Sequence, residues 1–344
     1  MPTSSIDFTM ATMAIIMVAA GAIYGVNMVA TPYLDGKDHN EDRYYQLGRS
    51  ILLSKGESDN WGTEATPKKL GLAQDGSPYK LDIDKVTRLN PENFYAVNYS
   101  TLWNAFKVDD VSVRFSFETV FDVELVQTGS KDNGDNTSYT FSLSCLDDGY
   151  PLATSVAYYT AIRDSVYKSS GTTGTDGTGT IKFTIANSKA GTGVIVAVAK
   201  LSEGFLSYDV LTFGHKSGVP ADPGTYAIAS PLDDVLSVDL TSGSSVLNVV
   251  VFTYGHYFNL TSIGDDIIIP EMVELSPMIL AVTGVNGTDY WAEWVAYPQI
   301  PLEVGADMDA DYVVSDVTKC SYLVEVSGVF YRFELKARSP EEYD

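Results

Sequence analysis

One run of alternating acidic residues could bind a cation. Asp307, Asp309 and Asp311 alternate within the segment GADMDADYVVSD. A calcium site needs several oxygen ligands held on a tight loop. An EF-hand loop is excluded, because Tyr312 occupies the position of its turn glycine and Thr318 that of its bidentate glutamate. A looser calcium site formed by the three aspartates and an acidic solvated turn remain as the two interpretations.

The three histidines show no catalytic or metal-binding spacing. His39 lies just after the N-terminal apolar stretch, His215 before a linker, and His256 between two tyrosines in a predicted strand. There is no H-E-x-x-H sequence, no nucleophile elbow and no phosphate-binding loop. Paired aspartates occur in turn sequences, where aspartate bonds the local backbone. We therefore predict that the protein is not an enzyme.

An uncharged stretch from Phe8 to Ala30 is long enough to cross a bilayer as a helix. No Lys or Arg precedes it in the sequence, and it is longer than the apolar part of a secretory signal. These features favour a retained membrane helix over a cleaved signal or a buried soluble helix. Gly21 and Gly25 form a G-x-x-x-G pattern that allows two helices to approach closely. Self-association and the ordinary abundance of small residues in membrane helices both account for that pattern.

The composition indicates an acidic, β-rich body. The chain has 344 residues, 45 acidic and 22 basic residues and a net charge of −23. This charge argues against nucleic-acid binding, because phosphate contacts require Lys and Arg. Cys145 and Cys320 lie far apart in the sequence, and two buried thiols are favoured over a bridge. Abundant Tyr, Ser, Thr and Gly favour an extracellular body, although Lys37, Arg43 and Arg49 after the apolar stretch favour the opposite orientation.

Four acceptor sequons for N-glycosylation occur in the sequence. Two of them lie in evident turns, where a glycan would be tolerated. The candidate acceptors are Asn98, Asn136, Asn259 and Asn286.

The periodicity of apolar residues changes along the chain. Helical spacing predicts helices over residues 41–55 and 81–89. Asn90-Pro91-Glu92 has the order of an N-cap, an N1 proline and a first-turn acid, which predicts a third helix reaching Phe106 and burying Phe94. Alternating residues separated by Gly- and Asp-rich turns then predict short strands of antiparallel sandwiches. The predicted strands are 113–117, 139–145, 156–161, 179–186, 194–201, 208–213, 235–240, 246–254, 267–269, 278–282, 290–296, 322–326 and 330–335.

These patterns predict a mainly β protein with an N-terminal transmembrane helix. A small helical juxtamembrane module follows the helix, and two antiparallel β-sandwiches follow the module. The linker Ser217–Thr225 separates the sandwiches. The predicted parts are residues 1–35 (apolar helix), 36–108 (helical module), 109–216 (first sandwich), 217–338 (second sandwich) and 339–344 (polar tail).

Turn sequences in the first sandwich resemble bacterial and archaeal surface Ig-like domains of the invasin type. The resemblance covers roughly residues 112–214 and implies an Ig-like sandwich. Its Gly and Asp residues serve tight turns, so it implies no binding residues. The matching segments are Asp147–Pro151, Ser170–Thr173, Asp176–Thr180, Phe183–Thr184 and Gly191–Thr192.

A second resemblance, over about residues 8–105, is to archaeal membrane-anchored surface proteins that share pilin-type N-termini. It rests on the apolar stretch and on the segments Tyr44–Gly48, Ile51–Gly56, Asn60–Gly62, Gly71–Ala73 and Leu81–Asp82. It implies a cell-envelope or filament component. A pilin-type precursor would carry a basic leader and an acidic fifth residue in the mature helix, for which Asp7 is the nearest candidate.

The expected function is that of a non-enzymatic protein of the cell membrane or cell surface, with its body outside the cell and a role in adhesion or envelope scaffolding. The alternative is a pilin-like subunit whose N-terminal helix forms the core of an extracellular filament. The expected partners are the membrane and a second copy, as a homo-oligomer or filament. No cofactor is expected besides the calcium ion considered for Asp307, Asp309 and Asp311.

Overall fold

The computed structural model describes residues 39–58, 60–75, 77–108, 111–263, 266–270, 277–308 and 317–338. These residues are mainly β, which confirms the predicted class. The predicted apolar helix, with Gly21 and Gly25, and the predicted polar tail lie outside the described residues. Among the helices that are described, none combines the length and the apolarity needed to span a membrane.

The chain divides into two units, residues 1–47 and residues 48–344. Helix α2 (His39–Leu53) begins in the first unit and confirms the helix predicted there. Past its end Gly56 adopts a φ of +80°, and a Cβ atom at this position would lie 2.4 Å from the carbonyl oxygen of Lys69. Only glycine tolerates both conditions, so this residue fixes the path of the chain away from the helix.

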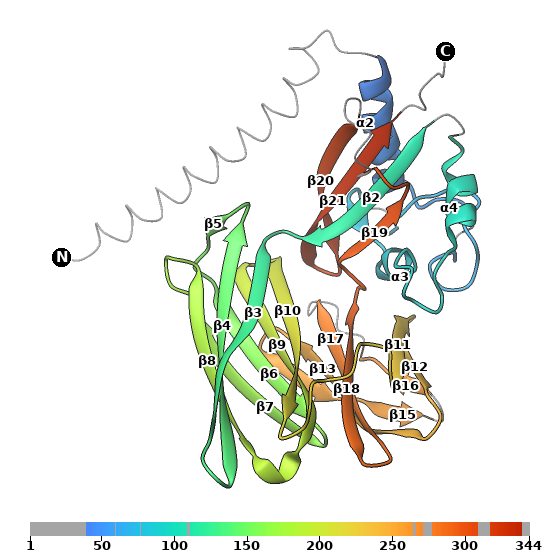
Figure 1. The fold of residues 1–344 in the computed structure, drawn as a ribbon. Coiled ribbons are helices and arrows are strands. Elements are labelled where there is room, and N and C mark those ends of the chain that lie inside the picture. Colours follow the sequence, from blue (N-terminus) through green and yellow to red (C-terminus); the bar gives the residue numbers. More distant parts are fainter. Residues whose placement is uncertain are drawn as a thin grey trace, which may run out of the picture. The chain divides into compact units, whose positions relative to one another are not determined.

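One five-stranded sheet, in the order β1-β20-β21-β2-β19, combines residues from both ends of the second unit (Figure 1). Helices α3 (Ile83–Thr87) and α4 (Tyr99–Phe106) belong to the same region, and the ring of Phe106 lies 5.8 Å from that of Phe115, centroid to centroid. Apolar residues alternate with polar ones along β2, so one face of this sheet is buried. The strands are β1 (Lys80–Leu81), β2 (Ser112–Thr119), β19 (Leu302–Gly305), β20 (Thr318–Val326) and β21 (Val329–Arg338).

This pairing corrects the predicted boundaries 36–108, 109–216 and 217–338. They place β2 in the first sandwich and β19 to β21 in the second, whereas Phe115 pairs with Leu335 and β19 also pairs with β2. Alternation in a sequence identifies a strand but not its partner, and here the partners lie on opposite sides of both sandwiches in the sequence. The two sandwiches are therefore inserted into one α+β domain, which consists of the five-stranded sheet with α3 and α4.

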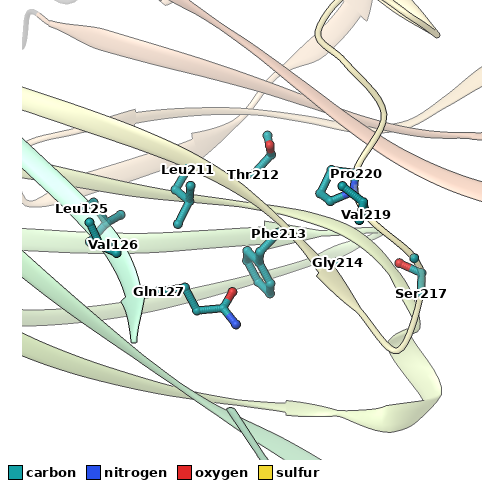
Figure 2. Close-up of a pocket in the computed structure, with 11 residues that line it drawn as sticks. Leu125, Val126, Gln127, Leu211, Thr212, Phe213, Gly214, Ser217, Val219 and Pro220 are labelled. Atoms are coloured by element: carbon teal, nitrogen blue, oxygen red, sulfur yellow. The ribbon is translucent and has the colours of Figure 1, made fainter. Parts of the chain in front are cut away.

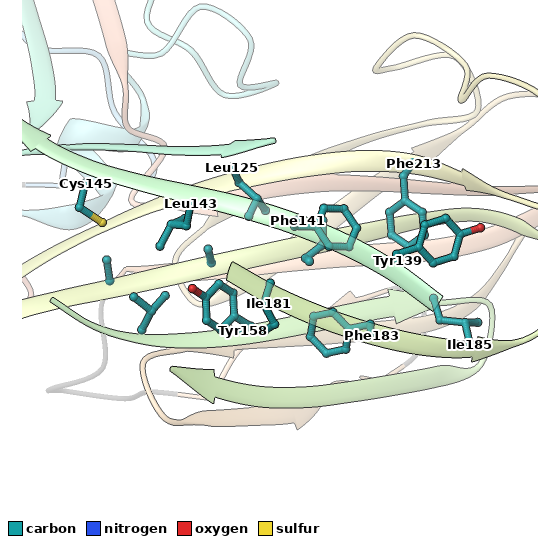
Figure 3. Packing of buried hydrophobic residues seen from close by; sticks show 14 of the residues in the cluster. Leu125, Tyr139, Phe141, Leu143, Cys145, Tyr158, Ile181, Phe183, Ile185 and Phe213 are labelled. Carbon is teal, nitrogen blue, oxygen red and sulfur yellow. The ribbon is translucent and has the colours of Figure 1, made fainter. Parts of the chain in front are cut away.

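The first sandwich spans β3 to β10. One sheet has the order β3-β4-β5, with β8 also paired to β4, and the other has the order β10-β9-β6-β7. Its core contains Phe141, Tyr158 and Phe213, which pack between the two sheets (Figure 3). The strands are β3 (Asp122–Asp132), β4 (Asn136–Asp147), β5 (Tyr150–Pro151), β6 (Ser155–Ile162), β7 (Ser165–Thr172), β8 (Thr178–Ala186), β9 (Gly191–Ser202) and β10 (Phe205–His215).

The second sandwich consists of the sheets β11-β12-β16-β15 and β14-β13-β17-β18. Its core contains Val251, Leu280 and Trp291. The strands are β11 (Ala227–Leu232), β12 (Val235–Leu240), β13 (Ser244–Thr253), β14 (His256–Asn259), β15 (Thr261–Ile263), β16 (Asp266–Ile268), β17 (Met278–Asn286) and β18 (Asp289–Tyr297).

A glycine opposite Trp291 allows the indole ring to lie flat on the sheet. A Cβ atom at Gly284 would lie 2.0 Å from Trp291 Cζ2 and 2.5 Å from the carbonyl oxygen of Ser245. We expect Gly284→Ala to lower the free energy of unfolding by about 1–3 kcal/mol through overpacking, measured by chemical denaturation. Gly129→Ala in β3 is the matched control, because nothing lies within 4 Å of its added Cβ. Equal losses in both variants would contradict the packing argument.

The two sandwiches pack on each other through β6 and β9, whose residues are buried on both faces. Tyr158 faces the core of the first sandwich, while its neighbour Tyr159 stacks on Phe252 of the second, with ring centroids 4.9 Å apart. The Tyr159 hydroxyl also donates to the carbonyl oxygen of Thr253 at 2.8 Å. Four sheets therefore follow one another as layers with filled interfaces.

The third predicted helix is shorter than expected. Asn98, not Asn90, is its N-cap, and the Asn90 side chain donates to the carbonyl oxygen of Gln299 at 3.1 Å. Phe94, predicted to be buried, is 44% exposed. The sequence Asn90-Pro91-Glu92 forms a turn, in which Asn90 Oδ1 accepts the backbone N–H of Glu92 at 3.0 Å and no helix follows.

Candidate binding groove

A groove lies between β3 and β10, which are edge strands of the two sheets of the first sandwich. Within the described residues, β3 pairs with β4 alone and β10 with β9 alone. The groove has a volume of about 670 Å³. Three segments line it: Leu125–Gln127 of β3, Leu211–Gly214 of β10 and Ser217–Pro220 of the linker.

The floor of the groove is the edge of the hydrophobic core. Leu125 and Phe213 belong to the core cluster, and Leu211 packs against it. Figure 2 shows the side chains of Leu211, Phe213 and Gln127 directed into the space between the strands. None of the residues that line the groove is titratable, so its chemistry is that of apolar and backbone binding rather than of proton transfer.

Asp209 bridges the two strands at one end of the groove. Its Oδ2 accepts the backbone N–H of Leu125 at 2.7 Å, and its Oδ1 accepts the backbone N–H of Val210 at 2.7 Å. Burial raises the pKa of the Asp209 carboxyl, its two backbone hydrogen bonds oppose the shift, and the nearby charge of Glu124 adds to it. One carboxylate therefore satisfies amide groups of both sheet edges, which otherwise have no strand between them.

His215 fixes the opposite end of β10. Its Nε2 lies 2.9 Å from the carbonyl oxygen of Ala186, and its Nδ1 lies 2.9 Å from the hydroxyl of Tyr139. A carbonyl only accepts, so the network assigns the proton to Nε2 and leaves Nδ1 to accept from the tyrosine. His215 is fully buried and structural.

Lys216 and Asp132 form an ion pair beside this histidine. Hydrogen bonds from Lys216 and from Asn187 lower the pKa of Asp132 to about 2. Polar contacts therefore join the two sheets at this end of the first sandwich, next to the groove.

The predicted calcium ligands are only partly within the described residues. Asp307 is exposed, and its Oδ1 lies 4.0 Å from Arg114 Nη1. Asp309 and Asp311 lie outside the described residues. In the part of the chain that the structure describes, no group of three or more His, Cys, Asp or Glu side chains could hold a metal ion.

The four sequon asparagines differ in their surroundings. Asn98, Asn136 and Asn259 are exposed, and the first of them uses its side-chain oxygen as a helix cap. The side-chain amide of Asn286 donates to Ser244 Oγ at 2.8 Å. A glycan on this fourth asparagine would compete with a hydrogen bond, whereas the other three amides face solvent.

The remaining candidate residues are dispersed. His39 starts α2, and His256 is exposed on β14. Cys145 and Cys320 are buried in different regions and form no disulfide, as predicted. Burial raises the pKa of the Cys145 thiol. None of these side chains meets another in a catalytic arrangement within the described residues.

Sequence reasoning missed the groove. The sequence indicates the linker Ser217–Thr225 but not β3, because Leu125 is the single buried residue of that strand. Asp209 sits within a predicted strand as an ordinary polar position. Predicting the site would require knowing that β3 and β10 are both edge strands. That depends on strand pairing, which the periodicity of the sequence does not reveal.

Comparisons with known proteins give no family. No family model and no curated protein match the chain. Among solved structures, HBP35 of Porphyromonas gingivalis has 13% identity and a TM-score of 0.20, over 52% of this chain and 64% of that chain. Human GIVD cytosolic phospholipase A2 has 9% identity and a TM-score of 0.14, over 68% of this chain and 33% of that chain. Similarities this low carry no argument about fold or function.

Proposed function

We propose that the chain is a non-enzymatic cell-surface protein, anchored by its N-terminal apolar segment, whose sandwiches face the outside of the cell and bind a partner. The observation that carries this proposal is the groove between β3 and β10, which offers an apolar floor and two sheet edges but no titratable lining residue. Such a site suits adhesion or envelope scaffolding, because binding a partner requires an accessible apolar surface and sheet edges but no catalytic side chains.

The packing of the domains supports a scaffolding role. Besides the contact of Tyr159 with Phe252, the guanidinium of Arg163 lies 3.8 Å from the ring centroid of Tyr290 and donates to its hydroxyl at 2.9 Å. At the α+β domain, Asn93 Nδ2 donates to Gln299 Oε1 at 2.9 Å and to the carbonyl oxygen of Pro231 at 3.1 Å. These contacts join the second sandwich to the first sandwich and to the α+β domain.

The test is to locate the full chain in the cells that produce it. We expect the body to be labelled by a membrane-impermeant amine reagent on intact cells and to require detergent for extraction. Electron microscopy of the purified protein should then show separate particles. Filaments would instead support the pilin-like alternative, in which the N-terminal segments with Gly21 and Gly25 form the core. Labelling only after lysis would overturn both proposals.

A further inference from the structure

We propose that the groove between β3 and β10 takes an extended polypeptide segment of a different protein, which is added as a strand and carries a Lys or Arg beside Asp209 and Glu124. This inference rests on the proposed role of the groove in partner binding. It adds the conformation of the partner, its side-chain pattern and its charge.

The sheet edges argue for a strand. Unpaired edge N–H and C=O groups are the usual template for an added strand. The N–H groups of Leu125 and Val210 point into the gap, since both reach Asp209. Strand alternation places the N–H groups of Gln127 and Thr212 on the same two edges, further along the groove. Asp209 therefore occupies the position that the first carbonyl groups of an added strand would take.

The floor argues for alternating side chains in the partner. In an added strand, every second side chain would face Leu125, Leu211 and Phe213, and the others would face solvent. Main-chain hydrogen bonds would supply affinity, and the apolar floor would select residues of the size of valine or leucine.

Charge argues for a basic segment from another protein. Asp209 and Glu124 lie close enough to interact at the same end of the groove, and the described contacts of both carboxylates are with N–H or hydroxyl groups. A cationic side chain there would neutralise them. The chain itself carries a net charge of −23, so two copies repel each other. A segment with Lys or Arg is favoured over a second copy for this reason.

Three capped seven-residue peptides test the proposal with the full chain in detergent. The first alternates threonine or serine with valine and ends in lysine, the second ends in glutamate, and the third has proline at its central position. We expect the lysine peptide to bind with a dissociation constant below about 1 mM. The glutamate peptide should bind about tenfold more weakly, and the proline peptide should not bind, because it lacks a main-chain donor. Absence of binding by the lysine peptide, or equal binding of all three, would overturn the proposal.

Two variants at one position locate the binding. Thr212→Pro removes an edge N–H, whereas Thr212→Ala removes the side chain and keeps this donor; an edge strand tolerates proline. We expect Thr212→Pro, but not Thr212→Ala, to raise the dissociation constant of the lysine peptide by about tenfold or more. If Thr212→Pro fails to fold, the three peptides still decide the question. Equal binding of the lysine peptide by both folded variants would overturn the proposal of an added strand. Self-association of the chain that only Thr212→Pro abolishes would assign the groove to a second copy and overturn the proposal of a basic partner. A chain found on the cell surface that binds none of the peptides would overturn this inference and leave the proposed surface location intact.

Discussion

Replacing Phe252 with alanine is expected to lower the free energy of unfolding by about 3–5 kcal/mol, and to destabilise both sandwiches together. The side chain is fully buried, and its ring stacks on Tyr159 of the other sandwich at 4.9 Å with an interplanar angle of 17°. Truncation leaves a cavity between β6 and β13 that neither sandwich can close alone, because each face belongs to a hydrogen-bonded sheet. The cost therefore appears in the unfolding of both.

The measurement is chemical denaturation followed by two probes. Amide hydrogen exchange of β17 reports on the second sandwich, and that of β4 reports on the first. Both should shift together in Phe252→Ala. Phe258→Ala on β14 is the matched control, since that phenylalanine is 37% exposed and its loss should cost less than about 1 kcal/mol. A shift confined to the exchange of β17 would mean that the sandwiches unfold independently, contrary to the layered arrangement.

The strands that the sequence predicted correctly share a local cause. In β2, for example, Val113, Phe115 and Phe117 are buried and their neighbours are not, so the period of two is visible without any knowledge of the fold. Strands β3 and β7 lack that signal because they are edge strands exposed over most of their length. Their existence is decided by pairing with β4 and β6.

The pairing of β2 with β21 and the bridge made by Asp209 could not be predicted from the sequence, for a related reason. Both depend on which segments become neighbours after the two sandwiches are inserted, and neither leaves a periodic pattern. The same holds for Asn90, whose position before a proline is typical of a helix start but whose side chain contacts Gln299. Polar residues that bond across domains are therefore the ones that local patterns misassign.

Asp84 is another such residue, and it makes the stability of the protein depend on pH. Its Oδ1 accepts the hydroxyl of Tyr297 at 2.7 Å and the backbone N–H of Asp233 at 2.9 Å, which joins α3 to the second sandwich. Burial raises the pKa of Asp84 from 3.8 to about 6, the two hydrogen bonds oppose the shift, and the charges of Asp82 and Asp233 add to it.

The other ionisable groups around this carboxyl come from three elements. Arg88 follows α3 and lies close enough to interact with Asp84. Asp234, beside Asp233, belongs to the turn between β11 and β12, and Tyr297 ends β18. Lys85 of α3 lies 3.9 Å from Asp82, so the three neighbouring aspartates face two cations. Ionisation of Asp84 therefore adds a negative charge to an environment that is already acidic.

Asp84→Asn is expected to remove a loss of stability that the wild type shows between about pH 4 and pH 6. The carboxyl binds its proton more tightly in the folded than in the unfolded state, so its contribution is fully present below the unfolded pKa and lost as pH rises through about 6. The loss amounts to at most about 3 kcal/mol, at about 1.4 kcal/mol per pKa unit. Asparagine keeps the acceptor oxygen for Tyr297 without the charge. The variant should therefore be more stable than wild type at pH 8 and similar to it at pH 4, by urea denaturation across this range. Asp289→Asn, at the exposed first position of β18, should leave the profile unchanged. A difference between wild type and Asp84→Asn that stays constant with pH would refute the assignment.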